Sequence, residues 1–233
     1  MSQTVSSEMI PRHYTEQEVQ DALAAFRHGD LCLLQGDIGY GLLGNSEGAI
    51  RKMYAAKGRS FSNPCIVISN MAILRDIASF PSRDIEHWVE QVSADSTLAV
   101  VLPVNPLSRL LPTLPSWVHG QVVTNGTIAA FLNVGPFLEE VIECARKQGM
   151  MIAGSSANPS SQGNIYEFAE LPPQIVAAAD FSIDHGRSRY ANPDRKATTI
   201  INFTNWTVKR HGVNAELIVP SFHRLMDQLA AAT

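Results

Sequence analysis

Two cations stand two residues apart in Lys57-Gly-Arg59, where a predicted helix ends. A lysine meets an anion as a point charge and an arginine as a bidentate fork, so the two can hold one phosphate or carboxylate group between them. Cations near a helix C-terminus are also favourable without a ligand, because they face the negative end of the helix dipole. Taken alone, this pair leaves both interpretations open.

A second candidate is Ser155-Ser-Ala-Asn158, which follows the apolar segment 150–153. Open α/β sheets bind ligands beyond the carboxyl ends of their strands, and hydroxyl groups with free backbone N–H groups can hold phosphate oxygens there. Serine and asparagine are also favoured in turns for local reasons. The segment therefore indicates a phosphate site only in combination with other features.

The run Gly39-x-Gly41-x-x-Gly44 matches the dinucleotide-binding fingerprint formally. That fingerprint requires a turn directly into a helix and an acidic residue about 20 residues later, at the end of the next strand. Ser69 and Asn70 stand at that position. The glycines therefore favour a tight exit from a strand, and a dinucleotide enzyme remains the weaker alternative.

The charge is distributed unevenly along the 233 residues, whose 18 Lys and Arg and 22 Asp and Glu give a net charge of −4. Residues 51–59 and 187–210 hold ten of the 18 basic residues and one of the 22 acids, so they carry +9 and the rest of the chain carries −13. A chain divided in this way is expected to gather a polyanion such as ATP or RNA.

The other reactive residue types favour no further chemistry. The seven histidines never recur at i, i+4 spacing, no Gly-x-Ser-x-Gly surrounds a serine, and the three cysteines form no Cys-x-x-Cys pair. These patterns disfavour a metallohydrolase, a serine hydrolase, a zinc site and a disulfide framework. The sequence shows no signal-peptide pattern and no apolar run of about 18 residues, so we expect a cytoplasmic protein without membrane contact.

The elements that must position these residues alternate between apolar strands and amphipathic helices, the first helix having a capping box at Thr15 and Glu18. The predicted strands are 31–34, 65–69, 98–102, 128–132, 150–153, 181–184, 198–202 and 206–210, and the predicted helices are 15–28, 47–56, 71–78, 84–92, 136–148 and 221 onward. Segments 36–44 and 154–163 are expected to be loops, and the prolines of 103–115 predict a surface connection or an edge. The pattern predicts an α/β domain with some antiparallel pairing.

Taken in order, five short motifs resemble the YrdC/Sua5/YciO family, whose members include L-threonylcarbamoyladenylate synthases. They are Gly39 to Leu42, Lys57 to Pro64, Ser156 to Asn158, Ala197 to Asn202, and Lys209 to Gly212. The resemblance implies a single-domain α/β fold, a twisted mixed sheet flanked by helices around a concave basic cavity. This domain would span residues 14–218, between an N-terminal extension at 1–13 and a C-terminal helix at 219–233.

The resemblance also implies a nucleotidyltransferase. In the family, ATP with Mg²⁺, bicarbonate and L-threonine give threonylcarbamoyl-AMP and pyrophosphate, the first step toward the threonylcarbamoyladenosine modification of tRNA. Carried over by position, Lys57 and Arg59 would be catalytic and would bind the nucleotide. Ser156, Asn158, Thr198 and Arg210 would complete the nucleotide site, Asp37 and Tyr40 would bind the other substrate, and no metal ion would be held by the protein itself.

The chain departs from the family pattern at the end where the amino acid would bind. Gln35-Gly-Asp-Ile38 replaces Pro-Thr-Asp-Thr, while Phe131 and Gly154 stand where the family has an arginine and a serine, and Ser69 or Asn70 stands where it has a histidine. The acceptor is therefore threonine or another amine. The alternative function is a non-catalytic or hydrolytic relative that binds nucleotide or double-stranded RNA in the same basic cavity. The nucleic-acid partner expected from the sequence is tRNA or double-stranded RNA.

Overall fold

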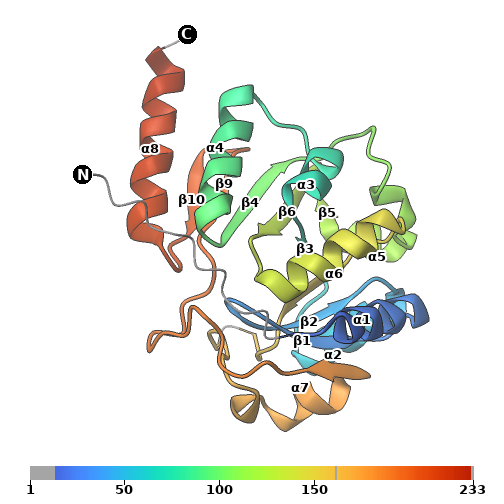
Figure 1. Ribbon diagram of the computed structural model, residues 1–233. Helices are drawn as coiled ribbons and strands as arrows, with labels where there is room; N and C mark the ends of the chain where they lie inside the picture. The colour runs from blue at the N-terminus through green and yellow to red at the C-terminus, as the bar shows by residue number, and fades with distance from the viewer. Residues whose placement is uncertain (1–13, 161, 232–233) are drawn as a thin grey trace.

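The computed structural model describes residues 14–160 and 162–231, which form a ten-stranded mixed sheet with helices packed around it (Figure 1). The strands are β1 Cys32–Gly36, β2 Gly39–Gly44, β3 Ile66–Ile68, β4 Leu98–Pro103, β5 Val123–Thr124, β6 Thr127–Leu132, β7 Ala153–Ser156, β8 Phe181–Ile183, β9 Ile200–Asn202 and β10 Thr207–Arg210. The predicted α/β class is confirmed. The proposed N-terminal extension, residues 1–13, lies outside the described residues.

The helices are α1 Glu16–His28, α2 Glu47–Ala56, α3 Met71–Ile77, α4 Arg83–Asp95, α5 Ser116–Val122, α6 Pro136–Lys147, α7 Pro173–Ala178 and α8 Ala215–Ala231, with short 3-10 turns η1 Leu111–Thr113 and η2 Phe168–Glu170. The capping box predicted for α1 is present, with Thr15 and Glu18 each accepting from the other's backbone N–H. In the described ranges no helix combines the length and the apolar character that a membrane span needs.

The strands lie in the order β10-β9-β4-β6-β3-β7-β2-β1-β8, and β5 pairs with β6 outside this path. Three neighbouring pairs are parallel, namely β9 with β4, β6 with β3 and β1 with β8, and the other pairs are antiparallel. The prediction that antiparallel pairs would occur is therefore confirmed. Elements distant in sequence, such as β7 and β2, become direct neighbours in the middle of this sheet.

The glycine-rich segment 36–44, expected to be a loop, is mostly a strand. β1 turns back into β2 as a tight hairpin in which Gly36 pairs with Gly39, and Gly39 has φ +117°, a conformation that favours glycine. The three glycines of the dinucleotide pattern all lie in β2, antiparallel to both β1 and β7, and no helix N-terminus follows them directly. The dinucleotide interpretation is therefore wrong, because that site needs a strand-to-helix turn.

Two further boundaries differ from the expectations and both bear on the site. The predicted strand 150–153 is shifted toward the C-terminus, so that Ser155 and Ser156 belong to β7 rather than to a loop. The last helix, α8, begins at Ala215 instead of 221 and contains Pro220 near its start. Pro220 lies beyond the first turn of the helix, so it removes one i→i−4 hydrogen bond, the one that would reach the Glu216 carbonyl oxygen.

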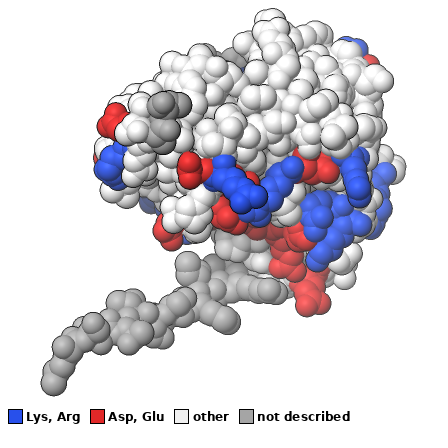
Figure 2. Space-filling model, turned by 90° about the horizontal axis from the view of Figure 1, so that it is seen from above, with Lys and Arg blue, Asp and Glu red and all other residues white. Residues whose placement is uncertain are grey.

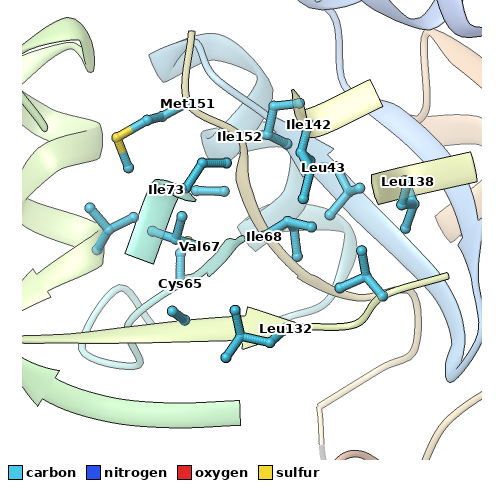
Figure 3. Packing of buried hydrophobic residues seen from close by; sticks show 14 of the residues in the cluster. Leu43, Cys65, Val67, Ile68, Ile73, Leu132, Leu138, Ile142, Met151 and Ile152 are labelled. Atoms are coloured by element: carbon cyan, nitrogen blue, oxygen red, sulfur yellow. The ribbon is translucent and has the colours of Figure 1, made fainter. Parts of the chain in front are cut away.

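Strands β1 and β4 are buried on both faces, whereas β6 packs on the core with one face only. On β6 the side chains of Ile128, Ala130 and Leu132 are buried, while Thr127, Ala129 and Phe131 between them are partly exposed. This alternation with period two shows that one face of the strand packs on the core and the other is open. Figure 3 shows the core layer at the strand ends, where Leu43, Ile68 and Leu138 come from different elements.

Candidate functional site

The open face of the sheet is the floor of a pocket of about 390 Å³. Its walls come from the β1–β2 turn, the segment after α2, the end of β7 and the chain around β9 and β10. The lining residues are Gly36, Ile38, Gly39, Tyr40, Gly41, Leu43, Arg59, Asn63, Pro64, Cys65, Ile66, Ile68, Ala99, Ala129, Phe131, Leu138, Gly154, Ser155, Ser156, Asn164, Ala197, Thr198, Ile200, Lys209 and Arg210. The pocket thus collects segments from both halves of the chain.

Three cations and no carboxylate line this pocket. They are Arg59, Lys209 and Arg210, and the lining contains neither Asp nor Glu nor His. Lys209 and Arg210 are consecutive, and consecutive strand residues usually point to opposite faces. The pairing of β10 with β9 shifts by one residue between Val208 and Arg210, which is the signature of a β-bulge and explains how both cations reach one pocket.

Arg210 is fixed by Thr198. Its Nε donates to the Thr198 carbonyl oxygen at 2.7 Å, and Thr198 itself is buried and lines the pocket. The guanidinium group carries further N–H donors on its two terminal nitrogens. These donors are therefore held in place beside the pocket, as recognition of a phosphate or carboxylate requires.

Lys57 plays a different part from the one predicted by its spacing to Arg59. Its side chain is only 4% exposed, and Nζ donates to the carbonyl oxygens of Ser156 and Asn158. Two of its three donors therefore fix the end of β7, and one remains. Burial, with a smaller contribution from the charge of Arg59, lowers the Lys57 pKa to about 8.

The lowered Lys57 pKa should make the free energy of unfolding depend on pH. Its pKa is about 8 in the folded protein against an ordinary value of 10.5, so between these values the unfolded chain binds more protons and the free energy of unfolding rises with pH. From pH 8 to about pH 9.5 the gain is about 2 kcal/mol. Urea denaturation over this range should show that the difference in the free energy of unfolding between the unsubstituted protein and Lys57→Met grows by this amount.

The difference between these two proteins isolates Lys57, because the buried Cys32 and Tyr54 thiol and hydroxyl groups, whose pKa burial raises, are common to both. Lys52→Met is the matched control, since the Lys52 ammonium is exposed and pairs with Asp180. Equal slopes in the unsubstituted protein and in Lys57→Met would contradict the burial of a charged Lys57.

Arg59 orders the segment that follows α2. Its Nη2 donates to the Pro64 carbonyl oxygen at 2.9 Å, and the Tyr54 hydroxyl donates to the carbonyl oxygen of Asn63 at 2.6 Å. These bonds bring Asn63 and Pro64 to the pocket wall. The arginine remains partly exposed there, so its charge faces the pocket.

Ser156 and Asn158 occupy different positions around the pocket. Ser156 pairs with Gly41 of β2 and lines the pocket, whereas Asn158 is buried behind it. The Asn158 amide nitrogen donates to the Pro159 carbonyl oxygen at 2.8 Å, and its Oδ1 is buried with no donor among the residues that the structure describes. Of these two predicted nucleotide-binding residues, only Ser156 therefore faces the pocket.

Of the two predicted substrate-binding residues, Tyr40 is hydrogen-bonded through its hydroxyl group, whereas the buried Asp37 Oδ2 has no hydrogen-bond partner among the described residues and only a loose ion pair. The Asp37 Oδ2 lies 3.5 Å from Arg189 Nη1, and burial raises the pKa of this carboxyl despite the arginine. The Tyr40 hydroxyl donates to the carboxylate of Asp184 and also lies 3.1 Å from the carbonyl oxygen of Gly186. Tyr40 lines the pocket and Asp37 does not.

The basic stretches are largely neutralised in space, which corrects the expectation of a divided molecule. Six of their ten basic residues have acidic partners, in the pairs Arg51–Glu47, Lys52–Asp180, Arg187–Glu167, Arg189–Asp37, Arg195–Glu170 and Lys196–Asp194. Figure 2 shows Lys and Arg side chains beside Asp and Glu along one band of the surface, next to a broad uncharged area. Within 14–160 and 162–231, Lys57, Arg59, Lys209 and Arg210 lack such a partner, and three of them line the pocket.

The sequence did not predict a functional role for Lys209 or Asn164, the two further polar residues of the pocket, or for the apolar floor of the pocket. Lys209 adjoins the predicted Arg210, but only the bulge brings it to the same side. Asn164 is buried in the pocket wall and donates to the carbonyl oxygen of Ile38 at 2.6 Å, a contact between residues 126 positions apart that no local pattern signals.

Among the described residues, no three His, Cys, Asp or Glu side chains gather as ligands for a metal ion.

The comparisons with known proteins agree with this architecture. The family model Sua5_yciO_yrdC, described as "Telomere recombination", matches residues 24–212. The threonylcarbamoyl-AMP synthase of Pyrococcus abyssi is 26% identical over 196 residues, which are 82% of this chain and 52% of that protein. The chain thus spans about half the length of this curated relative.

Solved structures show the same fold. A hypothetical protein from Streptococcus mutans matches with a TM-score of 0.73 at 17% identity, covering 88% of this chain and 91% of that one. The P. abyssi Sua5 complexed with L-threonine matches with a TM-score of 0.63 at 22% identity, covering 82% of this chain and 52% of that one. At these identities the likeness concerns the fold alone.

Proposed function

The chain belongs to the Sua5/YciO/YrdC family, and from this premise we propose that it is a nucleotidyltransferase of the L-threonylcarbamoyladenylate synthase type. It would form a carbamoyl-adenylate from ATP, bicarbonate and an amino acid, threonine or another amine, in the cytoplasm. With threonine as the acceptor, its product would supply the threonylcarbamoyladenosine modification of tRNA. The domain that performs this reaction would span residues 14–218.

The observation that carries the proposal is the charge of the pocket. Three cations line about 390 Å³ without a carboxylate, although acids outnumber basic residues in the whole chain. Such a pocket attracts an anion with several negative charges, because no negative side chain in its lining repels the ligand. The triphosphate of ATP has this character, and MgATP would enter as the substrate complex.

The proposed reaction needs no protein nucleophile. The amine and bicarbonate condense to a carbamate with loss of water, and a carbamate oxygen attacks the α-phosphorus of ATP. The bond from this phosphorus to the oxygen that bridges it to the β-phosphorus breaks, and pyrophosphate leaves. Arg59, Lys209 and Arg210 would neutralise the phosphates and hold the reactants in line, which is the main requirement of such a displacement.

The direct test is product formation by the purified protein with ATP, Mg²⁺, bicarbonate and a panel of amino acids. We expect pyrophosphate release that depends on both bicarbonate and the amino acid, together with an acyl-adenylate identified by mass spectrometry. A reaction without bicarbonate is the control for ATP hydrolysis. ATP binding without an acyl-adenylate from any acceptor would contradict the synthase proposal.

A nucleotide-binding relative without synthase activity is the second candidate. It is favoured by the engagement of the Tyr40 hydroxyl with Asp184, which leaves this group less available to a substrate. Extended double-stranded RNA is favoured less, because six of the ten basic residues are neutralised locally. RNA binding that weakens steeply with salt would support that partner.

A further inference from the structure

We propose that the acceptor amino acid of this protein has an apolar side chain, which binds at the end of the pocket formed by Ile38, Ile68, Phe131 and Leu138. The inference rests on the proposed function and specifies its second substrate. It is carried by the distribution of polar and apolar groups along the floor of the pocket.

The floor contains one continuous row of residues across five strands. Arg210 of β10 pairs with Ile200, Ile200 with Ala99, Ala99 with Phe131, and Phe131 with Ile68 of β3. All five line the pocket. With about 4.8 Å between neighbouring strands, Ile68 lies roughly 19 Å along the row from Arg210. The row therefore begins at a cation and continues over four strands of apolar side chains.

The far end of this row is closed by apolar groups from other elements. Leu138 comes from the first turn of α6, and its Cδ1 would lie 3.1 Å from a Cβ placed on Gly36. Ile38 lies in the adjoining β1–β2 turn and also lines the pocket. Figure 3 shows Leu138, Leu43 and Ile68 in one apolar layer. Ile38, Ile68, Phe131 and Leu138 are themselves uncharged, and the pocket cation nearest to them along the chain is Arg59, whose Nη2 donates to the Pro64 carbonyl oxygen two residues before β3.

The backbone around this end offers few free hydrogen-bonding groups. The Ile68 N–H donates to Ile152, the Ser69 N–H donates to the Phe131 carbonyl oxygen, and the Ile38 carbonyl oxygen accepts from Asn164. A purine needs partners for the polar atoms on its edges, and a threonine hydroxyl needs one for its oxygen. An aliphatic side chain needs none, so it fits this end better than either.

The experiment compares L-valine with L-threonine, which have nearly the same shape and differ by a methyl and a hydroxyl group. We expect kcat/KM for carbamoyl-adenylate formation to favour valine by about 10- to 100-fold, the usual penalty for a hydroxyl in an apolar pocket. Leucine and isoleucine add further aliphatic acceptors to the comparison, and serine adds a second acceptor with a hydroxyl group. A ratio of one, or a preference for threonine while pyrophosphate is released, would overturn the inference and leave the proposed function intact.

Binding measured without turnover separates the two proposals. Calorimetric titration of the protein, loaded with a non-hydrolysable ATP analogue, should show valine binding more tightly than threonine. Phe131→Ala should weaken valine binding by about 10-fold, whereas Leu107→Ala, at a residue 85% exposed and outside the pocket, should not. Valine preference without turnover would refute only the synthase. Absent binding of both amino acids, or valine binding unchanged by Phe131→Ala, would overturn this inference.

Discussion

Arg210→Glu should lower the affinity for ATP by at least about 100-fold, because it removes charge-assisted hydrogen bonds worth about 1.5–3 kcal/mol each and adds a negative charge to the pocket. The arginine is held by its Nε bond to Thr198, so its remaining donors are already oriented toward a ligand. Little ordering cost then opposes binding, and the loss on substitution is correspondingly large. Titration with ATP or its non-hydrolysable analogue, at fixed salt and Mg²⁺, measures the effect.

Arg187→Glu is the matched control for this variant. It makes the same change of charge within the same basic stretch, but Arg187 pairs with Glu167 and lies outside the pocket. We expect less than about a threefold change in affinity for ATP, because exposed charges at a distance are screened by salt. Equal losses of ATP affinity in Arg210→Glu and Arg187→Glu would mean that ATP binding depends on the total charge of residues 187–210 and not on Arg210 in particular. Thermal unfolding of both proteins establishes that each is folded.

Most elements of the fold were predictable because apolar periodicity reports burial directly. The segment 36–44 was not, since glycine is rare in strands and the local pattern indicates a loop. In the structure the neighbours of these glycines explain them: a Cβ on Gly44 would lie 2.7 Å from the Ala49 Cβ of α2, and one on Gly39 would lie 2.6 Å from the Ile165 carbonyl oxygen. Close packing by the neighbouring helix α2 and by the distant segment at Ile165 thus selects glycine here, and a single sequence does not show these contacts.

The site was predictable in its residue types but less so in their roles. Arg59, Ser156, Thr198 and Arg210 all reach one pocket, as their order along the chain indicated. Lys57 instead uses two of its donors on backbone carbonyl oxygens at the end of β7 and just beyond it. The neutralisation of the basic stretches depends on acids that are far away in sequence, as for Lys52 and Asp180, which are 128 residues apart.

Gly154→Ser should destabilise the fold by about 3 kcal/mol or more, at the upper end of the cost of overpacking. This position departs from the family pattern, and the structure gives a local reason. A Cβ on Gly154 would lie 2.1 Å from the Leu42 carbonyl oxygen and 2.8 Å from Leu43 Cδ2. The leucine side chain can rotate away, but the backbone oxygen can move only if β2 and β7 separate in the middle of the sheet.

Gly120→Ala is the control for this substitution, because a Cβ there meets nothing within 4 Å and the residue lies inside α5. Alanine should stabilise that helix by up to about 1 kcal/mol. Gly154→Ser should lower Tm by roughly 6–12 °C for a chain of this size. Gly154→Ala should cost nearly as much as Gly154→Ser, since the clash begins at Cβ. A Tm for Gly154→Ala within about 2 °C of the unsubstituted protein would show that β2 and β7 can separate at little cost, and that the serine of the family is compatible with this sheet.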